Sequence, residues 1–462
     1  MTTPSQSRSE GKALRASVPR TVHAGWSPAE DRRDAVAILE DQAQGRVKEL
    51  VPIRYGRMLS SPFAFFRGGA AIMAADLAET PTAGLEVQLC GDAHLANFGI
   101  FAAPDRRLVF DLNDFDETLR GPWEWDVKRL AASVAVAGRE RGFAGSGRVA
   151  AVRSAASAYR EAMSRYTGMR TIDVWYDRVD VEEQSQRWTE RANSARRRKL
   201  DQTVAKAREK DNLRAYEKLT HELDGAPRIV SDPPLIVPLE ELLDAGQPEP
   251  VKRELLQILQ QYRETLRSDL RQLLDRYQPV DLAHKVVGVG SVGTRCWVAL
   301  LLGHDGNDPL FLQIKEAGRS VLEPFAAPSP FATSGQRVVE GQRLMQAASD
   351  SFLGWLHVTA DLDGLPRDYY VRQLWDLKAS APIASFSQRE LSAYAGLCGS
   401  TLARAHARSG DRDAIAAYLG KSDRFDRAIC DFAEAYADQN ERDFETLAEA
   451  ARRGSIAVET GR

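Results

Sequence analysis

The sequence predicts an α+β protein in which a small antiparallel-sheet lobe accompanies a larger helical lobe. Residues 282–316 and 354–377 alternate between apolar and polar side chains, which is the period of half-buried strands. Residues 31–80, 123–170 and 388–462 instead carry apolar side chains at helical spacing. Strands that gather in one part of the chain, with helices before and after them, are typical of the α+β class.

Four regions follow from these patterns. Residues 1–30 are polar, and we expect them to form a flexible arm. Residues 31–280 are expected to form the helical lobe, with a strand–loop–strand region at 85–120. Residues 281–380 are expected to form the antiparallel-sheet lobe, whose last hairpin turns at Asp363-Gly364. Residues 381–462 are expected to be helices that complete the helical lobe.

Within the helical region, residues 181–219 are highly charged at helical spacing and read as an insertion. Acidic and basic side chains interleave there, which favours a solvated helical hairpin over a nucleic-acid-binding patch. Residues 224–239 are rich in proline and are expected to be extended. Residues 251–277 are expected to return to helix.

The composition is that of an ordinary globular protein, with 462 residues, 43% of them apolar and 27% charged. A net charge of −3 gives no general attraction to nucleic acid or to an anionic membrane. No apolar run reaches the length of a membrane span, and the N-terminal segment lacks the apolar core of a signal peptide. Cys90, Cys296, Cys398 and Cys430 are far apart in apolar contexts, so we expect reduced core thiols in a cytoplasmic protein.

The stretch CGDAHLANFGIF carries the strongest chemical signal, because it places Asp92 five residues before Asn97. One short hairpin later, LVFDLNDFDE adds Asp111, Asp114 and Asp116. In phosphotransfer enzymes of the protein-kinase type, one Asp orients or deprotonates the acceptor hydroxyl, while an Asn and a second Asp hold Mg²⁺ on the nucleotide phosphates. The alternative interpretation is a turn that is rich in Asp and Asn because these are common loop residues.

A second signal is the pattern G-x-G-x-x-G formed by Gly288, Gly290 and Gly293, with Ser291 inside it. A dinucleotide-binding fingerprint needs a helix directly after the glycines. Here TRCWVALLL follows, which is typical of a strand. A glycine-rich hairpin lying over a triphosphate fits better, because glycines let backbone N–H groups approach phosphate oxygens without a Cβ clash.

The next strand, LFLQIKEA, carries Lys315. An ammonium inside an apolar strand is costly unless it is paired, and in the kinase layout phosphates and a glutamate on the next helix pair with it. Glu340, in RVVEGQRL, is the preferred partner, and Glu316 and Glu323 remain alternatives. Lys315 on an edge strand with its head in water is the other interpretation.

Together these segments resemble the protein-kinase-like superfamily, and within it the aminoglycoside and choline phosphotransferase branch. The Asp-x-His-x-x-Asn core of that branch's catalytic loop is matched by Asp92, His94 and Asn97. The stretch NDFDE resembles the metal-binding Asp-Phe-x element, and GPWEWD, which ends at Asp126, resembles the segment that follows it.

The resemblance implies a role for each of these residues. Asp92 and His94 would be catalytic, Asn97, Asp114 and Asp116 would bind metal, and Asp126 would fasten the catalytic loop. Nucleotide binding would fall to Gly288, Gly290, Ser291, Gly293, Lys315 and Glu340, and the cofactors would be ATP and Mg²⁺.

Nearly the full length is also similar to a large bacterial family of uncharacterised proteins, the DUF2252 family. The matching stretches are RYGRM, SPFAFFRG, CGDAHLANFG, FDLNDFDET, GPWEWDVKRLAAS, VVGVGSVGTR and YYVRQLWDLK. This second resemblance implies no activity.

The order of the segments departs from the kinase pattern. In kinases the glycine loop and its lysine precede the catalytic loop, whereas here they follow it by about 200 residues. We therefore expect a circularly permuted, two-lobed kinase-like fold. Residues 397–411, LCGSTLARAHARSGD, resemble the helix that normally leads into the catalytic loop.

The sequence thus predicts an ATP- and Mg²⁺-dependent phosphotransferase that acts on a small-molecule or protein hydroxyl. Nucleotidyl transfer to protein and nucleotide binding without catalysis are alternatives that use the same residues. A metallophosphoesterase is less favoured, because Gly91-Asp92-x-His94 matches its Gly-Asp-x-His element but the other histidines are scattered singly. No nucleic-acid or membrane partner is expected, and the sequence indicates neither the acceptor nor an oligomeric state.

Overall fold

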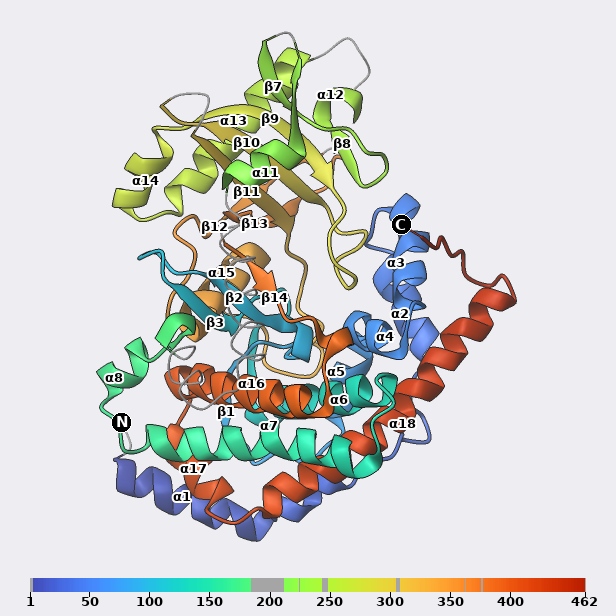
Figure 1. Cartoon of the computed structure of the whole chain (residues 1–462), viewed down its shortest axis with the longest axis vertical. Coiled ribbons are helices and arrows are strands. Elements are labelled where there is room, and N and C mark those ends of the chain that lie inside the picture. The colour runs from blue at the N-terminus through green and yellow to red at the C-terminus, as the bar shows by residue number, and fades with distance from the viewer. Residues whose placement is uncertain are drawn as a thin grey trace.

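The computed structural model describes residues 3–183, 212–223, 225–242, 248–304, 308–361, 363–374 and 377–461. The chain is a mixed α+β protein whose strands pair antiparallel in several sheets. Two lobes lie one above the other in Figure 1: the middle of the chain builds the upper lobe, and both ends of the chain build the lower one. Most of the charged insertion, residues 184–211, lies outside the described residues.

The upper lobe is built on a six-stranded antiparallel sheet with the order β12-β13-β11-β10-β9-β8. These strands are β8 (Ile236–Pro238), β9 (Gln278–Lys285), β10 (Cys296–Leu302), β11 (Pro309–Glu316), β12 (Gly354–Val358) and β13 (Arg367–Gln373). Strands β9 to β13 fall in the regions where alternation predicted them, and they form one antiparallel sheet.

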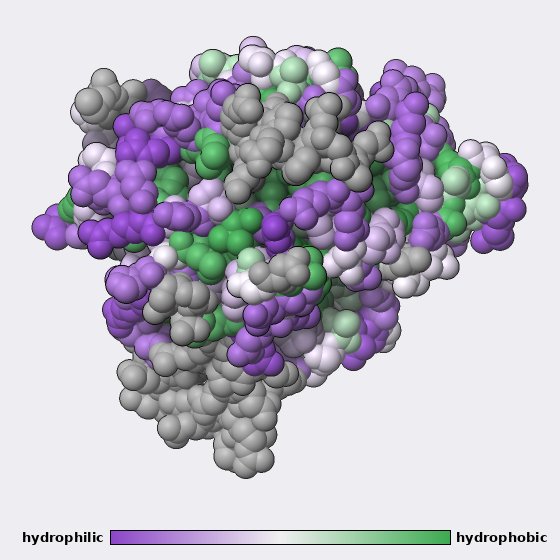
Figure 2. Space-filling view, turned by 90° about the horizontal axis from the view of Figure 1, so that it is seen from above, coloured by the Kyte–Doolittle hydropathy of each residue, from purple (hydrophilic) through white to green (hydrophobic). Residues whose placement is uncertain are grey.

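Successive side chains of β10 pack into different cores, as the period of a strand requires. Trp297 and Ala299 join a core with residues of α13 (Pro248–Glu264) and α14 (Ser268–Leu274). Val298 and Leu300 join another with α11 (Asn212–Leu219) and the hairpin strand β7 (Ala226–Ile229), which pairs with β6 (Thr220–Leu223). α12 (Leu239–Leu242) packs beside β8 and β9. Seen from above, this lobe shows small apolar patches among hydrophilic side chains (Figure 2).

This packing corrects the expected lobe boundary. Residues 31–280 were assigned to the helical lobe, but everything described between 212 and 274 packs on the upper sheet. The upper lobe therefore begins at residue 212 or before it, rather than near 281. Both faces of the upper sheet carry apolar side chains that must be buried, and the segment before β9 packs against them.

The lower lobe is a set of helices around two small antiparallel sheets. Its helices are α1 (Pro4–Ser17), α2 (Ala35–Ala43), α3 (Val51–Met58), α4 (Pro62–Gly68), α5 (Ala70–Ala78), α6 (Trp123–Glu140), α7 (Gly145–Tyr166), α8 (Thr171–Tyr176), α16 (Gln388–Ser409), α17 (Arg412–Leu419) and α18 (Arg424–Arg452). Its strands are β1 (Glu86–Leu89), β2 (Phe98–Ala102), β3 (Leu108–Leu112), β4 (Leu119–Pro122), β5 (Val179–Asp180) and β14 (Ala379–Ser380), paired as β1-β4 and β14-β2-β3-β5. One large core joins α6, α7, α16 and α18 and includes the inner face of α15 (Ser334–Met345).

The N-terminal region is not the flexible arm that its polarity suggested. α1 begins with a capping box at Thr3 and packs along α17. A Cβ on Gly11 would overlap the backbone of Ala414, so the absence of a side chain sets how closely the two helices approach. The two helices meet at a glycine and an alanine, which carry little side chain. The polar sequence of α1 therefore did not indicate that this helix packs against another.

The cysteines and the lengths of the helices bear on the expected cellular environment. All four cysteines are free and buried, as expected for core thiols. Throughout the described part of the chain, each helix is too short or too polar to cross a bilayer.

Candidate active site

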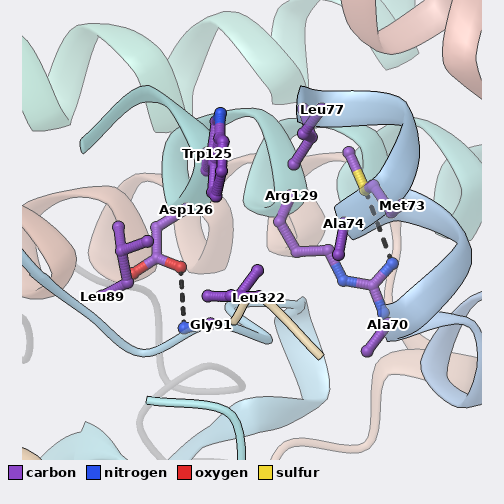
Figure 3. A pocket seen from close by; sticks show the side chains of 10 residues that line it. All are labelled: Ala70, Met73, Ala74, Leu77, Leu89, Gly91, Trp125, Asp126, Arg129 and Leu322. Carbon is purple, nitrogen blue, oxygen red and sulfur yellow. Dashed lines mark hydrogen bonds between the residues drawn. The ribbon is translucent and has the colours of Figure 1, made fainter. Parts of the chain in front are cut away.

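The loop between β1 and β2 carries Asp92 and Asn97, and α6 fastens its start. Asp126, in the first turn of α6, accepts hydrogen bonds from the backbone N–H groups of Cys90 at 2.7 Å and Gly91 at 3.0 Å. The Gly91 bond is drawn in Figure 3. Gly91 has φ +85°, and a Cβ there would overlap the backbone of Glu117. The fastening role expected of Asp126 is confirmed.

Asp92 is held by an arginine that the sequence analysis did not assign to the site. Arg129, also on α6, lies 2.7 Å from the Asp92 carboxylate and is only 3% exposed. It donates to the backbone oxygen of Phe66 at 2.7 Å, and its guanidinium lies 3.9 Å from the Phe66 ring centroid. These contacts hold the Asp92 carboxylate in one orientation while leaving it 22% exposed. The available signal was the spacing, because Arg129 lies three residues after Asp126 on the same helix face.

His94 lies beside Asp92 but is not bonded to it. Its Nε2 is 3.6 Å from Asp92 Oδ2, and its buried Nδ1 has no partner among the described residues. Burial lowers the pKa of His94 to about 4, with Arg129 and Arg67 adding to the effect against the opposing charge of Asp92. The imidazole is therefore neutral at pH 7.

Asn97 ties the loop between β1 and β2, which is the candidate catalytic loop, to the acidic loop, residues 113–118, that follows β3. Its Nδ2 donates to the backbone oxygens of Asp92 at 2.9 Å and Asp114 at 3.0 Å. Its Oδ1 is buried and has no partner among the described residues. A buried amide oxygen without a donor is costly, so this atom is suited to a ligand that the apo chain lacks.

Lys315, on β11, joins the two lobes through the acidic loop. Its ammonium pairs with the carboxylate of Asp116 and lies 3.6 Å from that of Asp114, while its side chain is 2% exposed. Tyr370, opposite Lys315 on β13, donates to Asp116 Oδ1 at 2.7 Å. Ser291 of the glycine loop donates to Asp116 Oδ2 at 3.4 Å. Asp116 thus contacts both the upper sheet and the glycine loop, whereas the side chain of Asp114 remains 43% exposed.

The pKa values of Asp114, Asp116 and Lys315 are shifted by burial and by one another's charges. Burial acts to raise the pKa of Asp114, but Lys315 and Arg372 outweigh it and hold that pKa below its usual range. Burial, aided by the charge of Asp114, raises the pKa of Asp116. Burial also works against the charged form of Lys315, yet the two carboxylates raise its pKa well above the ordinary value. At neutral pH, Asp114 is ionised and Lys315 is charged.

Glu340 does not pair with Lys315, which corrects that prediction. It lies 3.1 Å from Arg343 on the same helix, α15. The residue of α15 that reaches the acidic loop is Arg337, which donates to the backbone oxygens of Thr118 at 2.6 Å and Asp116 at 2.8 Å. The alternatives Glu316 and Glu323 also pair with arginines, as the ion pairs Glu316–Arg295, Glu316–Arg367 and Glu323–Arg319 show.

The glycine loop is followed by strand β10 and not by a helix, as predicted. Residues of α3 and of the segment before it hold this loop, and Figure 1 shows the loop reaching down toward α3. Arg57 donates to the oxygen of Gly288 at 2.6 Å, and Arg46 to that of Val292 at 2.6 Å. The Val47 N–H donates to the oxygen of Gly293 at 2.8 Å. The loop is therefore anchored to the lower lobe at both of its ends.

A small cavity lies behind the catalytic loop, between α5 and α6 (Figure 3). Apolar side chains such as Leu77, Leu89 and Trp125 line most of it, and Asp126 and Arg129 contribute its polar wall. These polar groups already bind the loop, so the cavity is part of the scaffold behind Asp92 rather than a second site.

The residues present fit a magnesium ion held on phosphates. Nowhere in the described ranges do three or more His, Cys, Asp or Glu side chains form a ready metal centre. Magnesium bound to a nucleotide needs only one or two protein ligands, with phosphate and water completing its shell. The partnerless Oδ1 of Asn97 and the exposed carboxylate of Asp114 are oxygen ligands of the right kind.

The comparisons with known proteins extend this description. No curated protein and no solved structure matches the chain. A family described as an uncharacterized protein conserved in bacteria, DUF2252, matches residues 46–450, a span that includes the catalytic loop, the acidic loop and the glycine loop. The chain belongs to the DUF2252 family.

Proposed function

We propose that the protein is a kinase-like phosphotransferase that uses ATP and Mg²⁺, built on a circularly permuted kinase-like fold. One observation carries the proposal. Lys315, from the sheet that bears the glycine loop, meets the acidic loop at Asp116 and Asp114, although 199 positions separate Lys315 from Asp116. The contacts of the acidic loop thus bring together a lysine, a glycine loop, an acid suited to metal and the loop with Asp92 and Asn97. Phosphoryl transfer needs this set of groups.

The junction between α16 and β1 supports the permutation. In kinase order, the chain would run from this helix directly into the strand before the catalytic loop. Here the two ends are separate in sequence but adjacent in space: the Gln88 N–H donates to Ser409 Oγ at 3.1 Å. A Cβ on Gly410 would lie 3.1 Å from the oxygen of Glu86. A cut and a rejoining of the chain account for this proximity.

The geometry supports a direct displacement. Asp92, oriented by Arg129, accepts the proton of the acceptor hydroxyl as the acceptor oxygen bonds to the γ-phosphorus. The bond from the γ-phosphorus to the β–γ bridging oxygen breaks, and ADP leaves. Asn97 Oδ1 and Asp114 would hold Mg²⁺, which when bound neutralises charge on the phosphates. Lys315 exchanges part of its pairing with Asp116 for phosphate oxygens.

Calorimetric titration of the full-length protein with ATP tests this function. We expect binding with Mg²⁺ present, and the Mg²⁺-dependent part should be lost when EDTA is added or when Asp114→Asn removes the ligand charge. Asp105→Asn is the matched control, because Asp105 pairs with Arg178 on the surface of the lower lobe. Product analysis with ATP labelled at the α- or γ-phosphate then separates phosphoryl from nucleotidyl transfer. A folded protein that binds no nucleotide at millimolar concentration contradicts the proposal.

A further inference from the structure

The turn at the end of α4 presents Arg67 to the catalytic loop and is fixed on both sides by buried arginines. Arg129 donates to the oxygen of Phe66 at 2.7 Å, and Arg54 donates to that of Gly68 at 3.3 Å. Arg129 also binds Asp92, so the turn and the catalytic aspartate share one anchor. The oxygen of Arg67 itself lies against Gly290 of the glycine loop, at 3.4 Å from the position of an added Cβ.

The Arg67 guanidinium is close enough to Asp92 and Asp114 to feel their charges, but it has no directly paired carboxylate among the described residues. Asp92 and Asp114 both act on it electrostatically, yet it forms no salt bridge with a carboxylate of the described residues. Its buried Nε has no partner there either. Burial, the larger effect, lowers the pKa of Arg67. Arg67 is thus a partly buried cation whose charge two nearby carboxylates offset from a distance, without a direct ion pair among the described residues.

Neighbouring arginines share this shortage of acid partners. Arg54 is 1% exposed, and its Nε and Nη1 have no partner among the described residues. Arg46, on the same side of the glycine loop, has a buried Nε without a partner. Buried arginines elsewhere in the chain do pair, as Arg404 does with Asp111 and Arg160 with Asp426. Arg54, Arg46 and Arg67 therefore bring more positive charge to this region than their directly paired carboxylates balance, which favours an anion beside Arg67.

We propose that Arg67 binds the phosphoryl group that is transferred, as a catalytic residue supplied by the N-terminal segment. This inference rests on the proposed function. Charge on the phosphoryl oxygens spreads in the transition state, and a fixed guanidinium beside them stabilises that charge without reorganising. The two arginines that fix the turn keep Arg67 in place before substrate arrives. The terminal phosphate of ATP, which ADP lacks, is the part of the nucleotide that Arg67 touches.

The test compares Mg-ATP with Mg-ADP on full-length protein by calorimetry. In Arg67→Met, we expect Mg-ATP affinity to fall about tenfold or more, while Mg-ADP affinity changes by less than about twofold. Turnover should fall by about 10²–10³-fold, the usual effect of losing one group that stabilises developing charge. Arg67→Lys should recover part of the ATP preference, because it keeps the charge but not the planar fork. Arg120→Met is the control, since Arg120 is an exposed residue of β4.

The outcomes separate this inference from the proposed function. Equal weakening of both nucleotides means a structural role for Arg67 and overturns the inference, and so does an unchanged ratio of ATP to ADP affinity. A rise only in the KM for the acceptor also overturns it, because Arg67 would then bind the acceptor. If Arg67→Met does not fold, the Arg67→Lys ratio decides alone, and a ratio equal to wild type rejects the inference. Wild-type protein that binds neither nucleotide rejects both proposals.

Discussion

Each carboxylate of the candidate site lies beside a cationic side chain from a distant segment of the chain. The motif itself predicted Asp92, Asn97 and Asp114, because Asp92 and Asn97 share one loop and the short β2–β3 hairpin returns Asp114 beside them. Their partners were not predictable in the same way, since Arg129 and Lys315 reach them through tertiary packing. Lys315 was expected to be paired because a buried ammonium demands it, but the choice of acid depended on the register of a helix that sequence spacing does not fix.

The pairing of Asp92 with the buried Arg129 gives it a structural role beside the catalytic role that we propose for it. In Asp92→Asn, we expect phosphoryl transfer to fall by about 10²–10⁴-fold, the range for a positioned proton acceptor. Mg-ATP affinity should stay close to wild type, because in the proposed reaction Asp92 contacts the acceptor hydroxyl and not the nucleotide. The free energy of unfolding should fall by about 1–2 kcal/mol, since Arg129 keeps a hydrogen-bond acceptor but loses its counter-charge. Transfer assays and urea unfolding measure the two effects, and unchanged turnover would reject the assigned role.

Glu117, next to Asp116, provides a test of the site that needs no substrate. Burial raises the pKa of Glu117 to about 7, Asp116 and Asp92 add to the effect, and the N–H of Val321 and Arg337 oppose it. The folded state therefore binds more protons than the unfolded state between the ordinary carboxyl pKa of about 4.5 and about 7. The stability contributed by this group falls as pH rises through that window.

Glu117→Gln should remove this pH dependence. We expect the variant to gain about 1–2 kcal/mol relative to wild type between pH 5 and pH 8. Denaturant unfolding at the two pH values gives the difference directly, and Glu49→Gln, at an exposed position before α3, is the control. A variant whose stability tracks wild type across the window would show that Glu117 is ionised at both pH values.

At the scale of elements, α15 shows why the glutamate prediction failed. Arg337 and Gly341 lie four residues apart on one face, and a Cβ on Gly341 would overlap the side chain of Thr118. Glu340, one residue earlier, is turned away by about 100°. The amphipathic pattern predicted the helix correctly, but it did not specify that Arg337 and Gly341, rather than Glu340, face the acidic loop. The glycines at positions 341 and 11 mark close helix contacts that hydrophobic patterns do not reveal.

Arg337 and Glu340 of α15 should therefore differ sharply in their contribution to the free energy of unfolding. Arg337→Met should lower the free energy of unfolding by about 2–4 kcal/mol, because it removes charge-assisted bonds and leaves buried carbonyls without donors. Glu340→Gln should change it by less than about 0.5 kcal/mol, since its partner Arg343 is a half-buried neighbour on the same helix. Chemical denaturation of both variants gives the comparison. A larger loss in Glu340→Gln than in Arg337→Met would contradict the assignment of Arg337 to the contact face of α15.

At the scale of the whole molecule, the lobes are joined by more than the chain. Val338 and Val339 of α15 belong to the core of the lower lobe. Arg57 of the lower lobe donates a hydrogen bond to Gly288 of the glycine loop. Lys315 and Ser291 of the upper lobe bind Asp116 of the lower lobe. The sequence predicted two lobes, and alternation located the strands of the upper one. It misplaced the boundary because residues 212–274 are mainly helical by pattern, although they cover the sheet.

These connections predict that the two lobes unfold together. Scanning calorimetry should show a single transition whose calorimetric and van't Hoff enthalpies agree, although the chain is long enough for separate domains. Because Mg-ATP would bridge Lys315 and the glycine loop above to Asn97 and Asp114 below, it should move the whole transition upward. At a concentration 100 times its dissociation constant, the added stability should be about 2.7 kcal/mol. In Asp114→Asn the transition should remain single but lose most of the Mg²⁺-dependent shift. Two transitions in wild type, of which nucleotide moves only the one from the upper lobe, would mean that nucleotide binds the sheet alone and that the acidic loop of the lower lobe takes no part.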